Sequence, residues 1–159
     1  GERMGFGETA LAEVEVAGLM HDIGKLCVPD EIVEKPARLT SAEFAVMERH
    51  SFETYQILRH VPGLERVAEW AAFHHETLDG SGYPFRRSAE TLSPEARVVA
   101  VADIFQALAQ ARPYRSAQGL DEISRILDEC AVRGMLDRDI VALARDDLEG
   151  SLRAATEVL

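Results

Sequence analysis

Residues 64–78 read LERVAEWAAFHHETL, the clearest helical pattern in the chain. The apolar residues and both histidines of this segment recur at i, i+3, i+4 and i+7, the spacing of one face of an α-helix. The pattern predicts a helix whose buried face is extended by His74 and His75. Two imidazoles that point inward together need polar partners, because burying a polar group without one costs free energy.

Two more helices are predicted before this segment. The first carries an apolar stripe at helical spacing that ends at His21. The second covers residues 40–58 and opens with Thr40 and Glu43, which have the spacing of a capping box. His50 lies on the edge of the apolar stripe of this second helix.

The second half of the chain shows the same periodicity. Residues 97–109 predict a helix that is apolar nearly all round, with Asp103 the one acidic residue embedded in it, so this helix belongs in the core. An amphipathic helix follows over residues 120–130, Asp137 caps another, and Gly150 predicts a break before a last short helix. Strand signals are nearly absent, so we expect an all-α helical bundle.

Length and composition predict one domain and exclude several classes of protein. The chain has 159 residues, 47% of them hydrophobic, and a net charge of −11 that repels nucleic-acid polymers. Cys27 and Cys130 form no disulfide or thiolate-ligand pattern. The longest apolar run is far shorter than the roughly 20 residues that cross a bilayer, and no signal peptide is visible, so we expect a cytoplasmic protein without a membrane segment.

The metal-capable side chains are the main functional signal. Taken singly, a histidine on an apolar face is more often a hydrogen-bonded core residue than a ligand. The joint arrangement is harder to satisfy with protein groups alone, whereas two divalent cations would use all of the donors. Imidazole and carboxylate ligands without thiolate favour manganese, iron or zinc. The candidate ligands are His21, Asp22, His50, His74, His75 and Asp103.

The basic residues near these donors suggest an anionic ligand. Lys25 follows Asp22 closely, so its ammonium is placed to meet a phosphate, although a solvated lysine is the alternative. Arg112 and Arg115 follow the Asp103 helix, and their guanidinium groups match phosphate geometry, with helix capping as the alternative. Asp22 could bridge two ions about 3.5–4 Å apart, the spacing used for two-metal hydrolysis of phosphate esters.

The order of these motifs resembles one known family. The motifs are His21-Asp22-Ile23-Gly24-Lys25, then His74-His75-Glu76, then the loop Gly80-Ser81-Gly82-Tyr83-Pro84, then Ala102-Asp103, and last Arg112-Pro113-Tyr114-Arg115. Together they strongly resemble the HD-GYP family, and the resemblance covers nearly the whole chain. We refer to residues 80–84 as the GYP loop.

The resemblance implies a helical HD-domain phosphodiesterase that uses two or three divalent metal ions, iron or manganese, to hydrolyse cyclic di-GMP to pGpG or GMP. A metal-activated hydroxide would attack phosphorus, with Asp22 and Lys25 as catalytic residues. The family's metal ligands fall on the six donors named above. Its substrate contacts fall on Lys25, Gly82, Tyr83, Arg112 and Arg115. Such domains are also expected to form homodimers or to be fused to a sensory or receiver domain.

The chain also departs from the family pattern. The family has a further ligand-bearing helix ahead of the His-Asp helix, so we expect residues 1–159 to be an N-terminally incomplete HD-GYP domain of a longer protein. Phe85-Arg86-Arg87 stands where a Gly-Leu turn is usual, and Gln106 replaces an acidic residue. Two alternatives to the enzyme stay open, a noncatalytic module that binds cyclic dinucleotides and an HD hydrolase of another nucleotide.

Overall fold

The computed structural model describes residues 2–111 and 116–157, and every regular element in these two ranges is a helix. The predicted all-α fold is therefore confirmed. Within these ranges, no helix combines the length and the apolar character needed to span a membrane. The elements, in chain order, are η1 (Glu2–Met4), α1 (Glu8–Met20), η2 (Ile23–Cys27), α2 (Asp30–Val33), α3 (Ser41–Met47), α4 (Arg49–Leu58), α5 (Glu65–Ala72), α6 (Pro94–Ala109), α7 (Leu120–Val132), α8 (Arg138–Arg145) and α9 (Leu148–Glu157).

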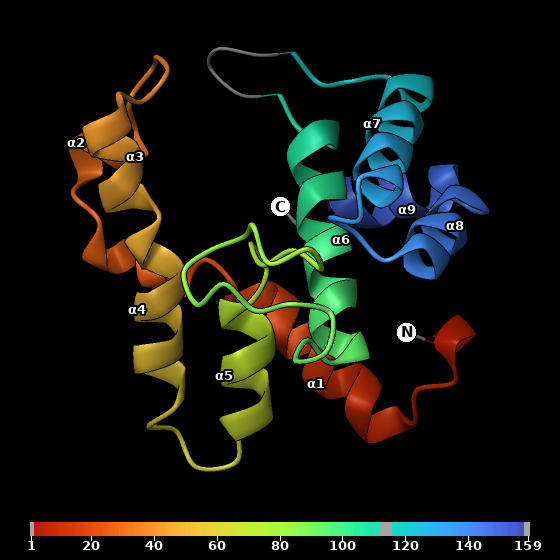
Figure 1. The fold of residues 1–159 in the computed structure, drawn as a ribbon, viewed down its shortest axis with the longest axis horizontal. Coiled ribbons are helices and arrows are strands. Elements are labelled where there is room, and N and C mark those ends of the chain that lie inside the picture. Colours follow the sequence, from red (N-terminus) through yellow and green to blue (C-terminus); the bar gives the residue numbers. More distant parts are fainter. Residues whose placement is uncertain (1, 112–115, 158–159) are drawn as a thin grey trace.

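Helix α6 is the central element, because it belongs to two apolar cores. Its first half packs with α1, α4 and α5 around Ala17, Leu58 and Val67. Its second half packs with α7 and α8 around Ile123 and Leu127. Figure 1 shows α6 standing between these two groups of helices. Buried residues occur from Ala96 to Ala109, as predicted for a core helix, although Ala102 is exposed. The two cores meet between Val99 and Val101, close to Asp103.

Side-chain caps define several helix starts, as the sequence predicts. Thr40 and Glu43 form a reciprocal capping box at the start of α3. The Asp137 carboxylate accepts backbone N–H groups from Asp139 and Ile140 and so caps α8. These caps satisfy N–H groups that a helix leaves without partners in its first turn.

Two predicted helices end differently in the structure. The helix predicted over residues 40–58 is divided at Glu48 into α3 and α4, and α5 ends at Ala72, before the histidine pair. In both places a histidine side chain is hydrogen-bonded to a main-chain carbonyl oxygen. His50 Nδ1 lies 2.6 Å from the Met47 oxygen, and His74 Nδ1 lies 2.6 Å from the Ala71 oxygen. Such local bonds compete with the regular helical ladder.

The predicted last short helix is present, but the break lies before Leu148 and not at Gly150. Helix α9 begins at Leu148 and passes through Gly150. The Asp147 carboxylate accepts the backbone N–H of Gly150, three residues later in the chain, at 2.9 Å. This is the geometry of a helix N-cap. The cap at Asp147 therefore sets the start of the last helix, and the glycine lies in its first turn.

Candidate metal centre

The six candidate ligands converge at the ends of α1, α4 and α5 and on α6. His50 Nε2 lies 3.1 Å from His74 Nε2 and 3.4 Å from Asp22 Oδ1. His21 Nε2 lies 3.3 Å from Asp22 Oδ2 and 3.5 Å from Asp103 Oδ1. His75 joins the cluster through Nδ1, which lies 3.6 Å from Asp103 Oδ2. Side chains that are far apart in the sequence thus form one continuous group.

Three of the histidines are held in the same way. The Nδ1 atoms of His21, His50 and His74 lie 2.5–2.6 Å from the carbonyl oxygen three residues earlier in the chain. A carbonyl oxygen only accepts hydrogen bonds, so each Nδ1 carries the proton and donates it. In a neutral ring the lone pair is then on Nε2, which faces the centre of the cluster. This is the arrangement in which protein backbone orients histidine ligands for a metal.

The donor set fits a cation because lone pairs face one another. His50 and His74 meet Nε2 to Nε2, and two acceptors at 3.1 Å do not bond to each other. The Ser51 hydroxyl lies 3.3 Å from His50 Nε2 and can satisfy one of them. Among the residues that the structure describes, no donor is left for His74 Nε2, whose side chain is fully buried. A metal ion would satisfy both.

The geometry contains two groups of donors that share His74. One consists of His50, His74 and His75, and the other of His21, Asp22 and His74. Within each group the ligand atoms lie within 4.8 Å of one another. Imidazole nitrogens and carboxylate oxygens are ligands that divalent transition metals accept. The residues present are therefore suited to hold divalent ions.

Burial keeps most of these imidazoles neutral. Desolvation lowers the pKa of His74 well below its ordinary value and that of His75 to about 4. The pKa of His50 is also lowered, again mainly by burial. Burial opposes ionisation of Asp22, but the hydrogen bond from His21 and the charge of Lys25 shift its pKa further in the other direction, well below the ordinary range. Neutral imidazole and ionised carboxylate are the forms that bind metals.

His21 behaves differently from the other histidines. Burial lowers its pKa, but hydrogen bonds to Asp103 and Asp22 outweigh this and raise the pKa to about 10. With only protein groups around it, Nε2 of His21 carries a proton shared between two carboxylates. A metal ion bound at this atom would have to displace that proton, so binding there releases one.

Thr54 and Gly24 position the His-Asp motif; Gly24 was predicted only as a member of that motif, and Thr54 was not predicted at all. The buried Thr54 hydroxyl donates to the His21 carbonyl at 2.9 Å and accepts the Gly24 N–H at 3.0 Å. A Cβ at Gly24 would lie 1.9 Å from the His50 carbonyl oxygen, so only glycine allows this approach of η2 to α4. The available signal was the polar face of α4, where Thr54 follows His50 by one turn.

The predicted substrate residues lie in different places. Lys25 Nζ is paired with Asp22 Oδ2 at 2.5 Å, at the edge of the cluster. The Tyr83 ring contacts the His75 ring, with their centroids 4.8 Å apart and their planes tilted by 39°, and Gly82 is buried beside it against the backbone of residues 75–77. Arg112 and Arg115 lie outside the described residues. The remaining histidine, His60, is exposed.

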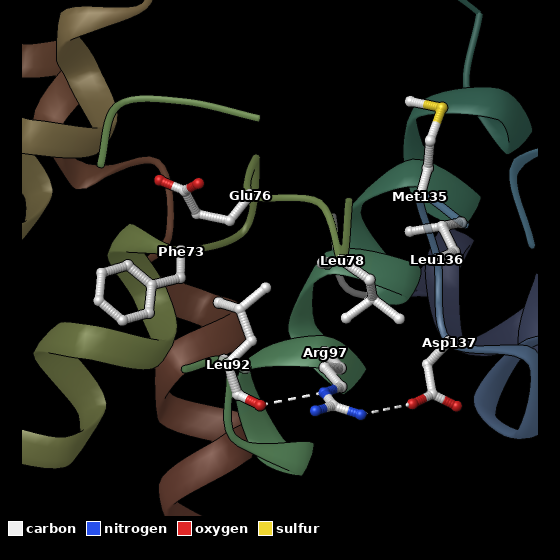
Figure 2. A pocket seen from close by; sticks show the side chains of 10 residues that line it. Phe73, Glu76, Leu78, Leu92, Arg97, Met135, Leu136 and Asp137 are labelled. Atoms are coloured by element: carbon white, nitrogen blue, oxygen red, sulfur yellow. Dashed lines mark hydrogen bonds and ion pairs between the residues drawn. The ribbon is translucent and has the colours of Figure 1, made fainter. Parts of the chain in front are cut away.

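Two hollows lie near the cluster. A groove of about 1010 Å³ runs between α1, α6 and α9 and includes His21 and Asp103 in its lining. A second pocket, of about 10 Å³, has room for no more than one water molecule. Figure 2 shows this small pocket, where Arg97 bonds to the Leu92 carbonyl and to Asp137. Of these two hollows, the groove has room for a ligand, and its walls are mainly apolar.

The chain is similar to several known proteins. The HD domain family matches residues 1–140. The 3'3'-cGAMP-specific phosphodiesterase 1 of Vibrio cholerae is 44% identical over 125 residues, which are 79% of this chain and 29% of that protein. The cyclic di-GMP phosphodiesterase response regulator RpfG of Xanthomonas campestris is 42% identical over 76% of this chain and 32% of its own length. A cyclic di-GMP phosphodiesterase of Thermotoga maritima is 40% identical over 80% of this chain and 35% of its own length.

These matches agree with the motifs and with the helical fold. The chain spans about a third of the length of these relatives, 29–35%. The family match, by contrast, extends over most of the chain and includes all six candidate ligands. The chain belongs to the HD-domain family, in the HD-GYP type that its motifs predict.

Proposed function

We propose that this chain is a metal-dependent phosphodiesterase domain that hydrolyses cyclic di-GMP to pGpG or GMP. The observation that carries the proposal is the convergence of the Nε2 atoms of His21, His50 and His74 on the Asp22 carboxylate, each ring held from behind by a main-chain carbonyl. The relatives named as phosphodiesterases support the same chemistry.

Two ions, iron or manganese, are proposed for the two donor groups that share His74. When bound, such ions would polarise a phosphate and lower the pKa of a bound water molecule, which makes it a better nucleophile near neutral pH. The proposed ligands are His21, Asp22, His50, His74, His75 and Asp103. Asp22 is the proposed bridging ligand, because its Oδ1 faces His50 and His74 while its Oδ2 faces His21.

The residues around the cluster have proposed roles in binding the substrate. Lys25 is half-buried at the open edge of the cluster, where its ammonium can exchange Asp22 for a phosphate oxygen and offset developing negative charge. Tyr83 offers an aromatic face beside His75, and aromatic faces stack on nucleobases. Arg112 and Arg115 are proposed as phosphate contacts, on the strength of their sequence motif.

The test is hydrolysis of cyclic di-GMP by purified protein loaded anaerobically with Mn²⁺ or Fe²⁺, with products separated by chromatography. Asp22→Ala should abolish hydrolysis, while His60→Ala, which changes an exposed histidine, should leave it intact. Undiminished hydrolysis in Asp22→Ala contradicts the mechanism. Calorimetric binding of cyclic di-GMP without any product in the wild-type chain would instead favour a noncatalytic sensor.

A second candidate substrate is 3'3'-cGAMP. The observation in its favour is the 44% identity to a phosphodiesterase named as specific for that compound. Both compounds are cyclic dinucleotides with the same phosphodiester chemistry, so the metal centre alone does not discriminate between them. Comparing kcat/KM for the two substrates under one metal condition decides which is preferred.

A further inference from the structure

The GYP loop and the residues that follow it, up to Arg87, are attached to residues 75 and 76 by a short series of hydrogen bonds and close contacts. A Cβ at Gly82 would lie 2.5 Å from the His75 carbonyl oxygen and from the Glu76 Cα atom, so the loop lies directly on this backbone. The N–H of Tyr83 donates to the His75 carbonyl at 3.2 Å. The loop that carries Tyr83 is therefore packed against the segment that carries the candidate ligands.

Glu76 continues this attachment with its side chain. Its carboxyl group is buried, with only 2% of the residue exposed. One oxygen accepts the N–H of Phe85 at 2.7 Å, and the other accepts the N–H of Arg87 at 2.8 Å. Among the described residues no ion pair involves Glu76, and Figure 2 shows its carboxyl group turned away from Arg97. Both oxygens of the buried Glu76 carboxyl group thus accept hydrogen bonds from the backbone just after the GYP loop.

The backbone turn at Arg86 allows Glu76 to accept hydrogen bonds from both Phe85 and Arg87. Arg86 has φ +53°, a left-handed conformation that residues other than glycine rarely adopt. The turn brings the N–H groups of Phe85 and Arg87, which lie on either side of it, onto the two oxygens of one carboxyl group. Two hydrogen bonds to one buried carboxyl group can hold the residue between them in an unfavourable backbone conformation.

We propose that Glu76 is a positioning residue that fixes Tyr83 against His75 and so sets the affinity of the site for its substrate. The N–H groups of residues 83, 85 and 87 all bond to residues 75 and 76, and the tilted Tyr83 ring contacts the His75 ring with the centroids 4.8 Å apart. This inference rests on the proposed function only where it concerns the substrate. The attachment of the loop is independent of it.

Glu76 acts through the loop rather than on the metal ions. Both of its carboxyl oxygens are engaged by main-chain N–H groups, and it belongs to neither group of metal-capable donors in the described chain. Its substitution should therefore change the loop and the binding of substrate, and leave the metal content as it is.

The test compares Glu76→Gln with Arg86→Gly. Gln has the shape of Glu but presents an NH₂ group where one backbone N–H needs an acceptor. We expect faster hydrogen exchange at the amides of Phe85 and Arg87, unchanged Mn²⁺ stoichiometry, and a KM for cyclic di-GMP raised about tenfold with kcat within about twofold. Arg86→Gly keeps both N–H donors and should keep exchange slow and KM unchanged.

Three outcomes overturn the proposal. They are unchanged exchange at residues 85 and 87 in Glu76→Gln, faster exchange with unchanged KM, and loss of bound Mn²⁺, which would make Glu76 a determinant of the metal site. If Glu76→Gln does not fold, the wild-type chain still decides, because fast exchange of the Phe85 and Arg87 amides contradicts the attachment. If the wild-type chain does not hydrolyse cyclic di-GMP, the exchange data still test the attachment of the loop, while calorimetric affinity for cyclic di-GMP replaces KM.

Discussion

His50 and His74 face each other through their Nε2 atoms at 3.1 Å, and each ring is held from behind by a carbonyl three residues earlier in the chain. His50 lies in α4 and His74 lies just beyond the end of α5, so folding itself brings the lone pairs together. Because the rings are held in place before any ion binds, the entropy of ordering the ligands is lost during folding rather than during binding. The centre is in this sense built to receive cations.

The first prediction is that Mn²⁺ stabilises the folded chain. A ligand that binds only the folded state adds about 2.7 kcal/mol at a hundred times its Kd. His74→Ala should remove most of this effect, because His74 belongs to both donor groups. The measurement is the midpoint of thermal unfolding with and without Mn²⁺, followed by EDTA. His60→Ala should respond as the wild type does, and an equal Mn²⁺ effect in His74→Ala would contradict the assignment.

The fold was predictable wherever local patterns and burial agree. The apolar periodicity of α1, α6 and α7 and the caps at Thr40 and Asp137 are recorded in the sequence, and the structure confirms them. The ends of α5 and α3 were not predictable in this way. Apolar periodicity does not show that a histidine side chain will bond to a carbonyl and end the regular ladder.

The candidate metal ligands were predictable from the sequence, but the residues that hold them in position were not. Donors such as His21 and Asp103 can be recognised in the sequence because they are polar residues on otherwise apolar helix faces. Thr54, Gly24 and Glu76 hold the site through contacts between segments that are distant in sequence or through main-chain groups. A single sequence does not show such contacts, because they depend on how the helices pack.

The second prediction concerns Thr54. Thr54→Val keeps the shape of the side chain but leaves the His21 carbonyl and the Gly24 N–H without their partner. The expected loss in the free energy of unfolding is about 1–3 kcal/mol, with weaker binding of Mn²⁺. Thr54→Ser keeps the hydroxyl and should retain the wild-type Mn²⁺ affinity. Urea unfolding and calorimetry measure the two effects, and equal Mn²⁺ affinity in both variants would disagree with a positioning role.

The third prediction uses two glycines with opposite surroundings. Gly24→Ala would place a Cβ 1.9 Å from the His50 carbonyl oxygen, and we expect a destabilisation of about 3 kcal/mol as α4 is pushed away. Gly18→Ala, in α1, meets no atom within 4 Å and should stabilise the chain by about 1 kcal/mol through helix propensity. Urea unfolding of the two variants would refute the packing if both changed stability in the same direction.

The fourth prediction concerns the left-handed residue Arg86. Glycine adopts φ near +53° without strain, although it loses more backbone freedom on folding. The expected net gain for Arg86→Gly is about 0.5–1 kcal/mol in the free energy of unfolding. Arg86→Ala removes the same charge but keeps the strain, so its stability should match the wild type. If the two variants are equally stable, any change in stability relative to the wild type comes from the loss of the charge and not from the backbone conformation of residue 86.

The last prediction is a pH effect at the start of α3. The hydrogen bond from Lys35, with those from Thr40, lowers the pKa of Glu43 from 4.5 to about 2. Because the folded chain favours the ionised form, this contribution to stability is complete above pH 4.5 and is lost as the pH falls toward 2. Glu43→Gln should therefore weaken the chain at pH 7 and lose less stability than the wild type between pH 5 and about 3. Urea unfolding at the two pH values measures the difference, and an NMR titration of the Glu43 carboxyl carbon that gives an ordinary pKa would contradict the assigned pairing with Lys35.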